Sequence, residues 1–128
     1  MASELRVDTL KDSSGNNSVD MTYVAEGSAK AWVNLDGTGT IALRDNFNVT
    51  STTDDGTGRY DFAITNAMAS TDYIINASGR QNESPPYTGM AFGIDAESTT
   101  VFHVSCRSTS GTLTDQEILC GTLHGDLA

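Results

Sequence analysis

The chain has 128 residues, which fits one domain, and its 17 acidic and 7 basic residues give a formal net charge of −10. The basic residues are dispersed singly, so no cluster of cations is present to bind a nucleic-acid phosphate backbone. The sequence also lacks the basic and apolar regions of a signal peptide and any long apolar run. Neither nucleic acid nor a membrane is therefore expected as a partner.

The apolar content is low for a folded domain. Leu, Ile, Val and Phe together make up about a fifth of the chain, close to the share below which a strongly charged chain is expected to be disordered. These residues nevertheless recur with the period of β-strands. We therefore expect a folded protomer that completes its burial against copies of itself.

Residues 1–28 are expected to form an N-terminal arm or leader strand, with the main domain at residues 29–128. Alternating residues predict one short strand near the start, and Leu5, Val7 and Leu10 are its candidate anchoring residues. Residues 11–18 have the composition of a loop, and residues 19–24 are compatible with a second strand. Because so short a segment buries little surface alone, we expect it to pack on a neighbouring subunit or to fix the domain to a particle. A frayed terminus is the alternative.

The region from residue 29 to 64 alternates apolar and polar residues between glycine-rich breaks, which predicts a meander of half-buried strands. It contains Trp32, the only tryptophan and an expected apolar anchor of the core. The breaks at residues 36–39 and 54–58 lack the Gly-Lys-Ser/Thr ending of a phosphate loop and the spaced carboxylates of an EF-hand. We expect two hairpin turns at these breaks.

Several motifs in this region occur together: Ala-Trp-Val-Asn at 31–34, Gly-Thr-Gly-Thr at 37–40, Arg-Asp-x-Phe-Asn-Val-Thr-Ser at 44–51 and Thr-Asp-Asp-Gly-Thr-Gly at 53–58. In combination they resemble a β-structured domain of tail-fibre-like and other virion surface proteins of tailed bacteriophages. The leader at residues 5–16 is similar to the segment that often precedes this domain. The resemblance implies a virion structural protein that forms a homotrimer, and it carries over no catalytic residue.

The segment at residues 78–89 contains both prolines and is expected to be an exposed loop. Long loops are often functional, so Arg80 and Tyr87 are the candidate partner-contact residues, with a plain connector as the alternative. Further strands are expected at residues 72–77, 90–94, 100–106 and 116–120, and no helix of ten residues is predicted. The expected fold is all-β, an antiparallel β-sandwich or jelly-roll-like domain preceded by an extended arm.

Cys106 and Cys120 fall in two successive predicted strands and share parity with apolar neighbours, so both are expected to face the interior. Two reduced core thiols are the main prediction, and a disulfide between paired strands is the first alternative. A metal site with His103 or His124 is the second, disfavoured because no Cys-x-x-Cys or His-x-x-x-His spacing is present. We therefore predict no metal and no cofactor.

No catalytic constellation is visible, because neither histidine lies near a nucleophile motif, and no enzymatic activity is expected. The main functional prediction is a trimeric capsid decoration (cement) protein, which binds the major capsid protein or another virion protein. It would be assembled in the host cytoplasm and displayed on the capsid surface. The absence of coiled-coil heptads and shaft repeats favours this prediction. The alternative is a tail fibre or receptor-binding module that recognises a host surface glycan or protein through the loop at residues 80–88.

Overall fold

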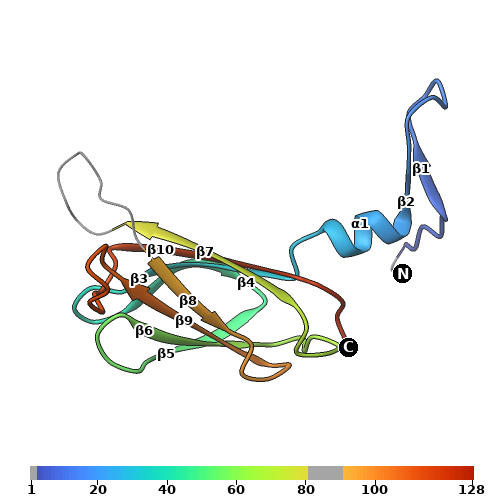
Figure 1. Ribbon diagram of the computed structural model, residues 1–128. Coiled ribbons are helices and arrows are strands. Elements are labelled where there is room, and N and C mark those ends of the chain that lie inside the picture. The colour runs from blue at the N-terminus through green and yellow to red at the C-terminus, as the bar shows by residue number, and fades with distance from the viewer. Residues whose placement is uncertain (1–2, 81–90) are drawn as a thin grey trace.

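Two four-stranded antiparallel sheets form a β-sandwich in the computed structural model, which describes residues 3–80 and 91–128 (Figure 1). The strand order in the first sheet is β4 (Ala42–Phe47), β3 (Ala31–Asp36), β10 (Ile118–His124) and β7 (Ile74–Arg80). The order in the second sheet is β5 (Val49–Asp54), β6 (Arg59–Ile64), β9 (Val101–Arg107) and β8 (Ala91–Asp95). The prediction of an all-β antiparallel sandwich is confirmed.

The alternation of the strands fills the space between the two sheets. In β6 and β9 every second side chain is buried, and Phe62 stacks on Phe102 with ring centroids 4.8 Å apart. Full burial of such a side chain stabilises the fold by about 1.5–3 kcal/mol. The first sheet contributes the buried residues Ala31, Val33, Leu35, Ile75, Leu119 and Leu123. The core is therefore built from both sheets.

The N-terminal segment extends away from the sandwich as a hairpin followed by a short helix (Figure 1). The hairpin consists of β1 (Thr9–Lys11) and β2 (Ser18–Asp20), and α1 (Met21–Gly27) follows directly. The expected strand over residues 19–24 is therefore wrong beyond Asp20, which occupies the N-cap position of the helix. Asp20 makes no side-chain capping bond, and its carboxylate instead accepts a hydrogen bond from the Thr9 hydroxyl (3.3 Å) across the hairpin. No helix in the described part of the chain has the length and hydropathy needed to cross a membrane.

The expected meander is interrupted at Asn48, where the chain crosses from one sheet to the other. The pairs β3–β4 and β5–β6 form the two predicted hairpins, but β4 and β5 belong to different sheets. Asn48 has a left-handed backbone (φ 57°), which asparagine tolerates better than most residues. Its side-chain amide donates to the carbonyls of Lys30 (3.0 Å) and Asn66 (3.2 Å), and its Oδ1 accepts from the Asn66 N–H (2.8 Å). These bonds fix the crossing.

A buried tyrosine links the two hairpin turns to the segment before β10. The Tyr60 hydroxyl lies 3.1 Å from both the Gly37 carbonyl oxygen and the Asp115 carboxylate, and the Gly58 N–H donates to the same carboxylate (2.7 Å). Burial, together with the negative charge of Asp115, raises the pKa of Tyr60 above its usual value of 10. The hydroxyl therefore stays protonated and can act as a hydrogen-bond donor.

The glycine at position 58 is required by space as well as by backbone conformation. Gly58 and Gly39 have similar positive φ angles (65° and 61°), but only at Gly58 would an added Cβ lie 2.7 Å from backbone atoms of Cys106 and Thr114. We expect Gly39→Ala to lower the free energy of unfolding by about 1–2 kcal/mol through backbone strain alone. Gly58→Ala should lower the free energy of unfolding by about 1–3 kcal/mol more than Gly39→Ala does, because the segment packed on Gly58 must move. Urea unfolding of the two variants measures the difference, and equal losses would contradict this close packing.

Candidate functional site

An acidic depression lies on the second sheet. It has a volume of about 280 Å³ and is lined by Asp55, Asp61, Asp95, Glu97 and His103. Four of these side chains are carboxylic acids, and no lysine or arginine of the described residues lines the depression. Such an arrangement favours a positively charged occupant.

Strand register brings three of these residues into one row. Asp61 on β6 lies directly opposite His103 on β9, and His103 lies directly opposite Asp95 on β8. The neighbours of His103, Phe102 and Val104, are buried, so the alternation directs the imidazole to the outer face of the sheet. The three strands thus place an acid on each side of one histidine.

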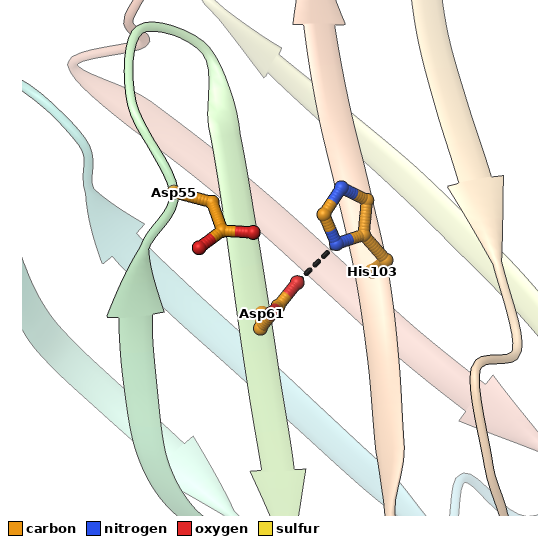
Figure 2. A group of neighbouring side chains, drawn as sticks. All are labelled: Asp55, Asp61 and His103. Atoms are coloured by element: carbon orange, nitrogen blue, oxygen red, sulfur yellow. Dashed lines mark hydrogen bonds and ion pairs between the residues drawn. The ribbon is translucent and has the colours of Figure 1, made fainter.

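Asp55 approaches the row from the β5–β6 turn (Figure 2). The turn is held by a bond from the Asp55 N–H to the Arg59 carbonyl (3.0 Å) and by a bond from the Gly56 N–H to the Asp54 carboxylate (2.9 Å). Ligand atoms of Asp55, Asp61 and His103 all lie within 4.8 Å of one another, and Nδ1 of His103 is hydrogen-bonded to the Asp61 carboxylate. Two carboxylates and an imidazole, the donor groups of many protein metal sites, therefore converge.

These residues are not recognisable as a group in the sequence. Alternation in β9 places His103 on the face opposite Phe102 and Val104, but alternation says only which face a residue occupies. The partner of each residue depends on strand pairing, and Asp61 lies 42 residues before His103. Alternation indicates that the side chains of Asp61 and His103 both point outward. The strand register that makes them neighbours cannot be read from the sequence.

The three candidate anchoring residues of the arm are exposed, Leu5 most strongly at 80%. Leu10 lies opposite Val19 in the β1–β2 hairpin, and Tyr23 on α1 is 71% exposed. Val19 and Tyr23 were not among the candidate anchoring residues, although both are apolar and lie in a segment with little core of its own. The arm thus carries unburied apolar surface, and its anchoring role stays a prediction.

Trp32 was expected to anchor the core, and this expectation is wrong. Trp32 is 37% exposed on the outer face of the first sheet, because its neighbours Ala31 and Val33 take the inward positions of β3. It lies directly opposite Phe47, which is 53% exposed. Beside this aromatic pair is a cavity of about 360 Å³ lined by Ala25, Ser28, Ala29, Lys30, Phe47, Asn48, Asn66 and Leu127. Apolar surface is therefore concentrated where the arm joins the sandwich.

The two cysteines occupy different sheets. Cys106 on β9 is buried, as predicted, whereas Cys120 on β10 is only partly buried between the inward positions Leu119 and Gly121. The inward orientation expected for Cys120 is therefore wrong, because the inward positions of β10 are residues 119, 121 and 123. Strands β9 and β10 are not paired, so the expected route to a disulfide through paired strands is absent, and both thiols are free.

Of the two candidate partner-contact residues, Arg80 belongs to the described part of the chain. Arg80 ends β7, opposite Ile118, and its Nη2 lies 3.6 Å from Oε2 of Glu117. The expectation of a loop from residue 78 is wrong for residues 78–80, because these continue the pairing of β7 with β10. Tyr87 lies outside the described residues, so the contact roles of both residues stay predictions.

Comparison with known proteins supports the fold. No protein-family model matches the chain, and no curated protein matches its sequence. Among solved structures, the chain is similar to the crystal structure of the phiAB6 tailspike, determined in complex with three-repeated oligosaccharides of Acinetobacter baumannii surface polysaccharide. The TM-score is 0.55 at 15% sequence identity, and the match covers 92% of this chain but 23% of the tailspike chain. The chain thus shares a fold with a segment of about a quarter of that tailspike.

The different surroundings of the two thiols predict different reactivity. Burial, and then the nearby Asp115, raises the pKa of Cys106 from 9.0 to about 12, so almost no thiolate is present near pH 8. We expect a maleimide to label only Cys120 in the folded protein. Cys120→Ser should abolish this labelling, whereas Cys106→Ser should leave it unchanged, as measured by intact mass. Rapid labelling of Cys106 without unfolding would contradict its buried position.

Proposed function

We propose that the chain is a surface component of a tailed-phage virion, formed by a self-associating β-sandwich that is attached through its N-terminal arm. The observation that carries this proposal is the fold likeness to the phiAB6 tailspike over 92% of the chain. The motifs at residues 31–58, which resemble tail-fibre-like virion proteins, support it from the sequence. No catalytic step by this chain is part of the proposal.

A position on the tail is favoured over the capsid surface. The similar structure is a tailspike, and its complex with an oligosaccharide makes a host surface glycan the ligand class to test for this chain. Capsid decoration, the main prediction from the sequence, is the second candidate. The two positions share the same sandwich and arm and differ in the virion protein to which the arm attaches.

Self-association is proposed to use the outer face of the first sheet. The Trp32–Phe47 pair exposes two aromatic side chains beside an apolar cavity, and burial of such side chains dominates the energetics of many interfaces. The formal charge of −10 disfavours close approach of two copies wherever acidic side chains would meet. The homotrimer implied by the sequence resemblance is the assembly that we propose.

Removal of the aromatic pair should weaken the assembly. We expect Trp32→Ser and Phe47→Ser each to raise the dissociation constant roughly 30-fold, which corresponds to about 2 kcal/mol. Light scattering coupled to size exclusion measures the change in mass with concentration. Ile94→Ser is the matched control, because Ile94 is 50% exposed on the second sheet. An equal effect of the control, or a monomeric wild-type protein at high concentration, would contradict the proposed interface.

Deletion of the arm should separate folding from attachment. Without residues 3–28, the sandwich should keep its cooperative unfolding, because none of its buried residues lies in the arm. Particles assembled with this truncated chain should lose the protein, since the exposed apolar residues of the arm are gone. Immunogold labelling of particles with the full chain should mark the tail. Label over the whole head would support capsid decoration instead, and a truncated chain retained on particles would contradict anchoring by the arm.

A further inference from the structure

We propose that Asp55, Asp61 and His103 form a binding site for a divalent transition-metal ion, with Zn²⁺ as the best-fitting member of the class. This site is independent of the proposed function, because it depends only on the second sheet and its β5–β6 turn. Figure 2 shows the three side chains directed toward a common point.

The spacing of the ligand atoms is close to that of a metal site. Two ligands bound to one Zn²⁺ at 2.0–2.1 Å in tetrahedral geometry lie roughly 3.3 Å apart. The atoms of Asp55, Asp61 and His103 already lie within 4.8 Å of one another, so small side-chain rotations close the site. Asp55 is exposed in a turn and has room to make this movement. Water can fill the fourth position, since the depression is open to solvent.

The ligand types select the class of ion. Ca²⁺ and Mg²⁺ prefer sites made of oxygen atoms, whereas an imidazole nitrogen combined with carboxylates suits Zn²⁺ and its neighbours in the first transition row. His103 provides that nitrogen from the centre of the cluster. A metal ion binds an unprotonated ring nitrogen of histidine, and the carboxylates around His103 would stabilise the charge of the incoming cation.

A simple ion pair does not account for the whole arrangement. A cross-strand contact between an acid and a histidine explains Asp61 and His103. It does not explain why Asp55, Asp95 and Glu97 line the same depression, in which the described part of the chain places no lysine or arginine. Mutual repulsion of these carboxylates costs free energy, and a divalent cation at their centre would remove that cost.

The supporting strands hold two of the ligands in place. Strands β6 and β9 are the two central strands of the second sheet, and Asp61 and His103 face each other across their ladder. Ligands on paired strands are positioned more accurately than ligands on loops. A bound ion would join the β5–β6 turn to β9 and so stabilise the folded state, by an amount that grows with the logarithm of the free metal concentration once this exceeds the dissociation constant.

Calorimetric titration of the full chain with Zn²⁺, after removal of metals by a chelator, tests the proposal. We expect one ion per chain and a higher melting temperature in the presence of Zn²⁺. His103→Gln and Asp55→Asn should each weaken binding at least about tenfold, because each removes one ligand. Co²⁺ should bind at the same site and give an absorption spectrum that reports nitrogen and oxygen ligands.

Two matched controls make the result specific. His124→Gln removes the other histidine of the chain, which lies on β10 in the first sheet, and Asp72→Asn removes an exposed carboxylate that does not line the depression. Both should bind Zn²⁺ like the wild type. Should His103→Gln fail to fold by circular dichroism, Asp55→Asn decides, because its side chain is exposed. Absence of Zn²⁺ binding, or binding that survives both ligand substitutions, would overturn the site.

Discussion

The register between β6 and β9 is the constraint on which both faces of the second sheet depend. With Phe62 opposite Phe102, the two aromatic rings stack in the core, and the adjacent pair, Asp61 and His103, is forced onto the outer face. A slip of one strand by one residue would bury the acid and expose a ring. The free energy gained in the core therefore also fixes the geometry of the acidic depression.

The two faces of the first sheet differ in how far their apolar side chains are buried. Its inner face is tightly filled, whereas its outer face and the arm beside it expose aromatic and aliphatic side chains, Phe47 and Tyr23 among them. A small domain with limited apolar content gains stability when such surface is removed from water. The proposed self-association and the proposed attachment by the arm would remove this surface from water.

Polar residues at the connections join the two sheets and position the candidate site. Asn48 makes the crossing between the sheets possible, and Tyr60, Asp115 and Gly58 hold the β5–β6 turn against the segment before β10. Asp55 belongs to the same turn, so its approach to His103 depends on these partly buried hydrogen bonds. The candidate site thus rests on contacts formed on the other side of the sheet.

The sequence by itself determined the fold class, the two hairpins and the outward direction of His103, because these follow from a period of two and from turn composition over short distances. Alternation alone assigned Trp32 and Cys120 to the wrong face of their strands. Which alternate residues of a strand point inward is decided only in the assembled sandwich. Only the tertiary structure decided the strand order, the crossing at Asn48 and the meeting of Asp55 and Asp61 with His103. These features arise from pairing between distant segments, which alternation along a single strand cannot specify.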